Sequence, residues 1–306
     1  MNKKIRQEFA DTMFEIGKKD PNLVVFVADI SHYILQPFEK ACPGRYYNIG
    51  ICEPTMVNMA AGLSKLGFHP VVHTFAPFLL ERSFEQIKID FGYQKLGVNL
   101  VASGSGFDYG YLGCTHHCYD DFALLKNIEN MQVIHPASPK EFNLLFKQTY
   151  NNKLPNYFRI PENSHEINLE DKEIVVGKAI KIKEGKDISI IVTGPQLKTA
   201  IDAINILDSN DINPEIIYVH TIKPFDKEMV NKSLEKTKKG LIIEEHSMYG
   251  GLLEEVLRYS KNLGEIKYSS INIGDKFIRN YGSYQDHCER LGFSVKGIEK
   301  KVNELF

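Results

Sequence analysis

The sequence predicts an α/β protein of two domains, each a mostly parallel sheet flanked by helices. Apolar runs of strand length alternate along the chain with segments of helical period. Strand and helix in alternation favour parallel sheets covered by helices. A chain of 306 residues suits two domains of about 150 residues each. The composition, with 43% hydrophobic residues, supplies ample core for both.

The first half of the chain contains five predicted strands, at residues 23–28, 70–74, 98–102, 132–135 and 157–160. A helix is predicted after Pro54, which suits the first helical position. Its residues 56–63 are apolar nearly all round, so the helix is expected to be buried. A second helix is predicted over 79–91. Ser138 and Glu141 form a capping box that begins a third.

Two irregular stretches divide this pattern. Residues 103–118 form a long glycine-bearing loop, and loops of this length in compact domains are usually functional. Residues 161–172 are polar, acidic and weakly patterned, which indicates a linker between domains at 1–165 and 175–306. The second domain is predicted to contain strands at 188–192, 215–219, 241–244 and 267–273, and helices at 196–207, 226–235 and 251–259.

Composition also excludes several classes of function. The net charge is −2 and no large cluster of lysine and arginine occurs, so binding to nucleic acid or to an anionic membrane is not indicated. The longest apolar runs are far shorter than a membrane span. No apolar stretch follows the basic residues near the start, so no signal peptide is expected. Five cysteines at irregular spacing indicate reduced thiols and a cytoplasmic protein.

Glu53 is the first candidate functional residue. It directly precedes Pro54, so its carboxylate lies at the entry of a helix that is expected to be buried. One interpretation is an ordinary first-turn acid stabilised by the helix dipole. The alternative is a ligand-binding carboxylate, and the position of Glu53 alone does not decide between them.

Further candidates follow the ends of two other predicted strands. Phe75 and Phe78 follow the strand at 70–74, and His116 lies in the loop after the strand at 98–102. Ligands of open α/β sheets bind at the carboxyl ends of strands. A carboxylate, two flat rings and a histidine at that edge suit a heteroaromatic ligand whose ring nitrogen needs a proton partner.

Each of these candidates has a plainer interpretation. Phe75 and Phe78 could be core residues, and His116 and its neighbour His117 could cap a turn. The run from Cys114 to Cys118 also resembles a zinc-binding sequence, but no second ligand pair at a finger-like spacing exists. No metal ligand is therefore assigned in this chain. The joint occurrence of these residues in this order favours the functional interpretation.

Several blocks of the sequence, covering nearly the whole chain, resemble the transketolase family. They are Gly50-Ile51-Cys52-Glu53 with the helix after it, Thr74-Phe75 with Phe78, Gly113-Cys114-Thr115-His116, Asn156-Tyr157-Phe158-Arg159, Thr221-Ile222-Lys223-Pro224-Phe225-Asp226 and the block from Glu244 to Leu252. The resemblance implies a pyrimidine-binding domain of the thiamine-diphosphate-binding fold, followed by a transketolase C-terminal-like domain.

The resemblance also implies an incomplete site. The family anchors its diphosphate through a metal held by Gly-Asp-Gly and a downstream asparagine in a separate N-terminal domain. No Gly-Asp-Gly occurs here, and the nearest match, Gly274-Asp275-Lys276, lies in the wrong domain. The chain is therefore expected to be the C-terminal half of a split transketolase. An N-terminal subunit would carry Mg²⁺ or Ca²⁺, and a homodimer core with two such partners would form a heterotetramer.

Residue roles follow from the same resemblance. Glu53 would hydrogen-bond the pyrimidine ring nitrogen of thiamine diphosphate and share a proton with it, while Phe75 and Phe78 would pack against the ring. His116 would act in catalysis by hydrogen-bonding hydroxyls or the carbonyl oxygen of a sugar substrate. Arg159 would pair with a substrate phosphate or other anion; the alternative for Arg159 is a structural salt bridge.

The expected reaction is the transfer of a two-carbon ketol unit from a ketose, or ketose phosphate, to an aldose. Two departures from the family pattern favour a modified sugar or a dedicated biosynthetic substrate. Leu112 replaces an acid that reads a sugar hydroxyl, and an additional histidine is absent near Gly104. The alternatives are a subunit resembling deoxyxylulose-phosphate synthase or another 2-oxo-acid-decarboxylating enzyme, and a non-catalytic scaffold paralogue.

Overall fold

The chain forms two compact units. The computed structural model describes residues 3–306. The first unit comprises the described residues up to Ser105 together with Leu124–Ser164, and the second comprises Gly106–Ala123 together with His165–Phe306. Within the described residues, no helix is long and apolar enough to cross a bilayer.

The first unit contains a parallel sheet whose six strands lie in the order β5-β6-β4-β3-β1-β2. Strands β1 and β4 are buried along their whole length, as their apolar sequences predict. The strands are β1 (Leu23–Val27), β2 (Tyr46–Asn48), β3 (His69–Phe75), β4 (Val98–Ser103), β5 (Gln132–Ile134) and β6 (Pro155–Ile160).

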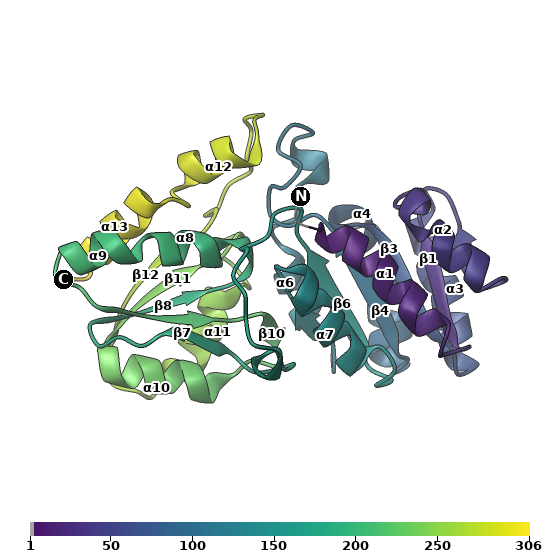
Figure 1. Ribbon diagram of the computed structural model, residues 1–306, viewed down its shortest axis with the longest axis horizontal. Coiled ribbons are helices and arrows are strands. Elements are labelled where there is room, and N and C mark those ends of the chain that lie inside the picture. Colours follow the sequence, from purple (N-terminus) through teal and green to yellow (C-terminus); the bar gives the residue numbers. More distant parts are fainter. Residues whose placement is uncertain (1–2) are drawn as a thin grey trace. The chain divides into compact units, whose positions relative to one another are not determined.

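Helices cover this sheet. Figure 1 shows α1 and α7 side by side in front of the strands, and these two helices are in contact. Helix α3 packs on β3. The helices are α1 (Ile5–Gly17), α2 (His32–Ala41), α3 (Glu53–Lys65), α4 (Ala76–Leu80), α5 (Phe84–Gln86), the π-helix η1 (Ile87–Tyr93) and α7 (Pro139–Thr149), while α6 (Asp121–Lys126) contains residues of both units.

The single helix predicted over 79–91 is wrong in its continuity. The structure divides it into α4, α5 and the π-helix η1, with a turn at residues 81–83. The apolar positions are nevertheless buried, among them Leu79, Ile87 and Phe91. Apolar periodicity identifies which side chains face the core, but it does not fix the hydrogen-bond register, which shifts to i→i+5 in a π-helix.

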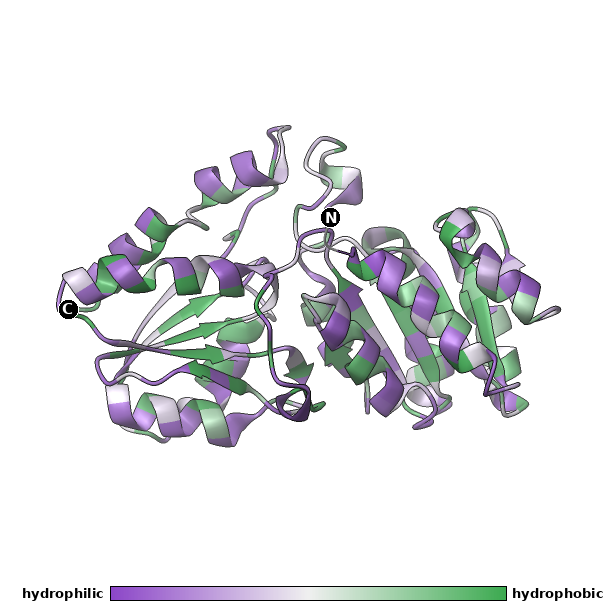
Figure 2. Ribbon diagram, viewed as in Figure 1, coloured by the Kyte–Doolittle hydropathy of each residue, from purple (hydrophilic) through white to green (hydrophobic). Residues whose placement is uncertain are grey.

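The second unit contains a sheet in the order β12-β11-β8-β9-β7, parallel except for the antiparallel edge strand β7. Figure 2 shows its strands coloured as hydrophobic and its helices striped, as amphipathic cover requires. The strands, including a short β10, are β7 (Ile180–Lys183), β8 (Ile188–Val192), β9 (Pro214–Tyr218), β10 (Thr221–Lys223), β11 (Lys239–Ile243) and β12 (Lys267–Ile271).

The helices of the second unit are α8 (Leu197–Asp202), α9 (Ile204–Ser209), α10 (Lys227–Thr237), α11 (Leu252–Ser260), α12 (Tyr284–Leu291) and α13 (Val295–Asn303), with short 3₁₀ helices η2 (Cys114–His116), η3 (Asp171–Glu173) and η4 (Gly194–Gln196). The helix predicted over 196–207 is interrupted at Ala203, between α8 and α9. The fold class predicted from the sequence, two mostly parallel sheets flanked by helices, is confirmed.

The capping box predicted at Ser138 is confirmed in its first half. The Ser138 hydroxyl accepts a hydrogen bond from the Glu141 amide at 3.3 Å. The Glu141 carboxylate, however, accepts from the amide of Ala137 at 3.3 Å, one residue before the position that a capping box requires.

Candidate active site

Glu53 begins helix α3 and is almost completely buried, with 2% of its surface exposed. A tight turn directly before Glu53 sets its position. The Asn48 side chain accepts hydrogen bonds from the amides of Asp29 and Gly50, each at 3.1 Å. Gly50 has φ +72°, a conformation that glycine adopts without strain. The turn after β2 therefore places a carboxylate at the positive end of a helix.

Arg82 holds this carboxylate and was not anticipated from the sequence. Its Nη1 lies 3.2 Å from both Oε1 and Oε2 of Glu53. The same guanidinium lies over the ring of Phe78, 4.1 Å from the centroid, in a cation–π contact. The spacing of four residues between Phe78 and Arg82 is the signal that could have found it. Arg82 thus connects the acid to the aromatic pair.

Phe75 and Phe78 form an edge-to-face pair at the carboxyl end of β3. Their ring centroids are 5.9 Å apart at an interplanar angle of 82°. Both side chains are only partly buried, unlike the core aromatics of this unit. A ring pair that keeps exposed surface at this edge can pack against a further flat ring.

His73 fixes the strand beneath these rings. Its Nδ1 lies 2.8 Å from the Val101 carbonyl and its Nε2 lies 2.8 Å from the Ser31 hydroxyl. Full burial lowers the pKa of His73 to about 4. The neutral ring can donate from Nδ1 to the carbonyl and accept from the hydroxyl at Nε2, so it ties β3 to β4 and to the turn before α2.

His116 lies in η2, within the loop that belongs to the second unit. Its Nδ1 is 3.0 Å from the Thr115 hydroxyl, and its side chain is partly exposed. Gly113, with φ +76°, turns the chain directly before this 3₁₀ helix. The arrangement leaves Nε2 of His116 on the side of the ring away from Thr115.

The loop that carries His116 packs closely on the rest of the second unit. A Cβ at Gly110 would lie 2.5 Å from Nε2 of His287, so no larger residue fits there without movement. Phe107 is fully buried and stacks on Tyr284 with centroids 5.3 Å apart. Tyr284 in turn donates its hydroxyl to Glu245. These contacts hold the loop against helix α12.

His117 supports the loop from within. It is 3% exposed, and neither ring nitrogen has a hydrogen-bond partner among the described residues. The ring faces His287 edge-on, with centroids 5.8 Å apart. Burial, followed by the charges of His287 and His116, lowers the pKa of His117 to about 4. Of the two adjacent histidines, His116 is the one that a ligand can reach.

The titration of His117 predicts a loss of stability in acid. Its pKa is about 4 in the folded chain, against an ordinary value of 6.5. The unfolded chain therefore binds the proton first, and the free energy of unfolding falls as the pH drops from 6.5 towards 4. His117→Leu breaks no hydrogen bond and is expected to reduce this slope. Urea unfolding at several pH values measures it.

The exposed His32 offers a matched control. His32→Leu should leave the slope between pH 6.5 and 4 as it is in the wild type. An unchanged slope in His117→Leu would contradict the assignment. His73, whose pKa is lowered in the same way, should account for part of the slope that remains.

Arg159 lies near the end of β6, paired with Ala102 of β4. It is fully buried. A buried charge requires compensating partners, which either a structural salt bridge or a bound anion can supply. Leu112, at the position of the expected acid, is 40% exposed in the loop of His116.

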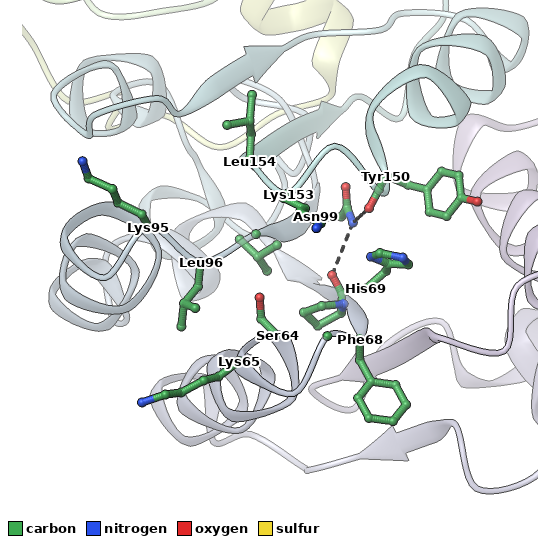
Figure 3. Close-up of a pocket in the computed structure, with 14 residues that line it drawn as sticks. Ser64, Lys65, Phe68, His69, Lys95, Leu96, Asn99, Tyr150, Lys153 and Leu154 are labelled. Atoms are coloured by element: carbon green, nitrogen blue, oxygen red, sulfur yellow. Dashed lines mark hydrogen bonds between the residues drawn. The ribbon is translucent and has the colours of Figure 1, made fainter.

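The structure thus brings Glu53, Phe75 and Phe78 to one edge of one sheet, joined through Arg82. A hollow of about 230 Å³ lies at the opposite edge, beside the first residues of β3 and β4. Figure 3 shows the side chains of Lys65 and Lys95 pointing away from the other residues that line it. Lys65, Lys95 and Lys153 are among the residues that line this hollow, which is separate from the candidate site.

The sheet of the first unit presents an almost buried carboxylate and two partly exposed rings at the carboxyl ends of its strands. This arrangement defines a class of α/β protein that can bind a heteroaromatic cofactor. Residues 2–166 match the transketolase pyrimidine binding domain, and residues 177–298 match the transketolase C-terminal domain. The chain belongs to the transketolase family, which confirms the resemblance seen in the sequence.

Relatives identify the part of the family that the chain represents. It is 34% identical to a putative transketolase C-terminal section of Methanocaldococcus jannaschii, over 99% of this chain and 96% of that protein. It is 32% identical to a 6-deoxy-6-sulfo-D-fructose transketolase subunit of a Clostridium species, over 98% of this chain and 94% of that subunit. The chain therefore corresponds to the C-terminal subunit of split transketolases.

Two further comparisons extend this result. A 1-deoxy-D-xylulose-5-phosphate synthase of Halothermothrix orenii is 30% identical over 89% of this chain, which spans only 43% of that enzyme. A solved split gene transketolase, described as an inactive beta4 tetramer, superimposes with a TM-score of 0.89 at 28% identity, over 98% of this chain and 97% of that one.

Proposed function

We propose that this chain is the C-terminal subunit of a split, thiamine-diphosphate-dependent transketolase that transfers a two-carbon ketol unit from a ketose to an aldose. One observation carries the proposal: the almost buried Glu53 carboxylate at the start of α3, connected through Arg82 to a partly exposed edge-to-face ring pair. A relative named as an apulose-4-phosphate transketolase subunit, in Phocaeicola vulgatus, is 32% identical over 98% of this chain. Together with the sulfofructose relative, it supports a modified or biosynthetic sugar as the substrate.

The residues of the candidate site fit the cofactor's pyrimidine ring. An ionised carboxylate offers about four acceptor positions, and Arg82 contacts the two oxygens of Glu53 through a single nitrogen. Room for a further hydrogen bond from a ring nitrogen therefore remains. Phe75 and Phe78 would pack on the ring. When bound, thiamine diphosphate supplies the electron sink for breaking a bond next to a carbonyl.

This chain's own residues would control position and protons. Glu53, held in place by Arg82, would share a proton with the ring nitrogen. His116, positioned by Thr115, would hydrogen-bond the carbonyl oxygen or a hydroxyl of the sugar through Nε2. Arg159 stays a candidate for pairing with an anionic group of the substrate, with the structural salt bridge as its alternative.

The site would need a second chain. The sequence has no Gly-Asp-Gly, so the Mg²⁺ or Ca²⁺ that offsets the diphosphate charge would come with an N-terminal subunit. A homodimer core with two such partners would form a heterotetramer. The inactive beta4 tetramer of the solved relative supports the need for a partner. Five free cysteines support a cytoplasmic assembly.

The test begins with a tagged pull-down of the chain from its own cells, in thiamine diphosphate and Mg²⁺, followed by native mass spectrometry. We expect a stoichiometric second chain that carries Gly-Asp-Gly, with the cofactor bound. The reconstituted complex should transfer a ketol unit from a ketose, and either chain alone should not. Recovery of a cofactor-free homo-oligomer without transfer would contradict the proposal and favour a scaffold.

A second candidate function is a subunit resembling 1-deoxy-D-xylulose-5-phosphate synthase. The relatives of that name, 26% to 30% identical to this chain, favour it. Consumption of pyruvate distinguishes the two reactions. The same complex, supplied with pyruvate and an aldose phosphate, should release no carbon dioxide if it is a transketolase, and it should do so if this alternative holds.

A further inference from the structure

A hollow of about 490 Å³ in the second unit has no role in the function proposed above. It is lined by side chains of the edge strand β7, of its neighbour β9 and of helix α10. Its volume is within the range of small-molecule pockets, about 300 to 1,000 Å³. The lining combines charged groups of both signs with two apolar side chains, Ile217 and Met229.

A buried carboxylate positions two cations of this lining. Glu215 lies on β9 and is only 2% exposed. The Ser233 hydroxyl donates to its Oε2, and Nζ of Lys236 lies 2.7 Å from its Oε1. Nζ of Lys181, on β7, lies 3.7 Å from the same Oε1. Because a buried carboxylate requires such partners, Glu215 holds both ammonium groups beside the hollow.

Glu184 shows which group these two cations can bind. It directly follows β7, and its side chain is 67% exposed. One carboxylate oxygen accepts from Lys181 and the other from Lys236. These hydrogen bonds, from Lys181 and then from Lys236, lower the pKa of Glu184 to about 2.

The Glu184 carboxylate is replaceable at this position. Ion pairs of exposed side chains contribute little to stability. The two lysines, in contrast, keep their contacts with the buried Glu215 whether or not Glu184 is in place. A free oxyanion that enters the hollow therefore finds two ammonium groups already oriented towards one carboxylate position.

A third cation and an apolar surface extend this position into a larger site. Lys232, on the same face of α10 as Met229 and Lys236, makes no hydrogen bond or ion pair with any other described residue. Ile217 and Met229 give the hollow apolar surface that a hydrocarbon group can cover. The remaining acid, Glu235, is exposed, so water and salt screen its charge.

We infer that the hollow between β7, β9 and α10 binds a small organic anion, whose oxyanion displaces the Glu184 carboxylate from Lys181 and Lys236. Lys232 adds a third positive charge, and the two apolar side chains contact the hydrocarbon body of the ligand. The shared chemistry is an oxyanion, which a carboxylate and a phosphate both supply. The inference goes beyond the proposed function and does not depend on it, because no residue of the candidate active site takes part.

The test follows the methyl group of Met229 by NMR, in the full chain with isotope-labelled methionine methyl groups and with any partner that copurifies. Three probes carry the same four-carbon chain: pentanoate, butyl phosphate and butanol. We expect at least one anionic probe to shift the Met229 signal saturably, at concentrations where butanol has no effect. Comparison of the two anions distinguishes a carboxylate ligand from a phosphate ligand. Met229→Leu assigns the signal, and the exposed Met248, which does not line the hollow, is the internal control.

Two variants change the affinity in opposite directions. Glu184→Gln should tighten the binding of that probe about 2- to 5-fold, because the group to be displaced no longer carries a charge. Lys232→Gln should weaken it about 2- to 5-fold and leaves the partners of Glu215 untouched. Asp202→Asn is the matched control for the first variant. Asp202 forms an exposed ion pair with Lys198 on α8, 2.6 Å between Oδ1 and Nζ, away from the lining of the hollow.

Three results would overturn the inference. The first is a Met229 signal that neither anionic probe shifts saturably, in the wild type and in Glu184→Gln alike. The second is a shift by butanol equal to that of the anions, which would mean an apolar pocket without anion selectivity. The third is an equal change of affinity in Glu184→Gln and Asp202→Asn, which would mean a general effect of net charge.

Discussion

Glu53→Gln is expected to lower the turnover of the assembled enzyme by about 10²- to 10⁴-fold, the range over which positioned acid–base groups contribute. The carboxylate lies almost buried at the start of α3 and is held by Arg82 at 3.2 Å. Glutamine keeps the shape and one acceptor oxygen, but it cannot share a proton with a ring nitrogen. Thiamine diphosphate should therefore still bind. Steady-state rates, with cofactor affinity measured by calorimetry, separate the two effects.

A matched control is available at another helix start. Glu228 is an exposed acid in the first turn of α10. Glu228→Gln makes the same change of charge beside a helix N-terminus and should leave turnover unchanged. Near-normal activity of Glu53→Gln in the assembled complex would remove Glu53 from the mechanism, and it would leave the helix-dipole interpretation as the explanation for this acid.

Glu244→Leu is expected to lower the free energy of unfolding by about 3 to 5 kcal/mol, since each hydrogen bond to a charged group contributes about 1.5–3 kcal/mol. Glu244 is fully buried directly after β11. Its carboxylate accepts from the amides of Leu252 and Leu253, at 2.5 and 3.0 Å. These amides open α11 and have no partners within the helix. Urea unfolding followed by circular dichroism measures the change.

Glu244→Gln should lower the free energy of unfolding by less than Glu244→Leu does, because glutamine keeps one acceptor oxygen. Glu289→Gln, an exposed acid on α12, should be neutral. A loss below about 1 kcal/mol in Glu244→Leu, the size of an average substitution, would mean that other groups cap α11. Gly251 supports the assignment, because a Cβ there would lie 2.0 Å from the Glu244 carboxylate oxygen. The family resemblance of this block thus has a structural explanation.

The sequence predicted the elements that depend on local pattern. The apolar run of β8 was predicted at residues 188–192, which are the bounds that the structure shows. Pro54 correctly indicated the entry of α3, which begins one residue earlier, at Glu53. Both predictions succeed because a strand's burial and a helix's first turn are determined by residues adjacent in the chain.

Features that depend on long-range packing were not predicted. The break of the helix predicted over 79–91, which includes a change to a π-helix, had no periodic signal. The prediction of one continuous helix over 196–207 was wrong for the same reason, because the interruption at Ala203 leaves the apolar pattern intact. Hydrogen-bond register within a helix is decided by what the helix packs against.

By itself, the sequence determined the alternating α/β architecture, the family and the candidate acid at a helix entry, because local patterns and motifs encode each of these. The tertiary structure alone decided what surrounds the acid and the histidine. Arg82 reaches Glu53 across 29 positions of the chain. Phe107, in the loop that carries His116, stacks on Tyr284, which lies far along the sequence. Such pairings arise when separate elements pack together, and no periodicity records them.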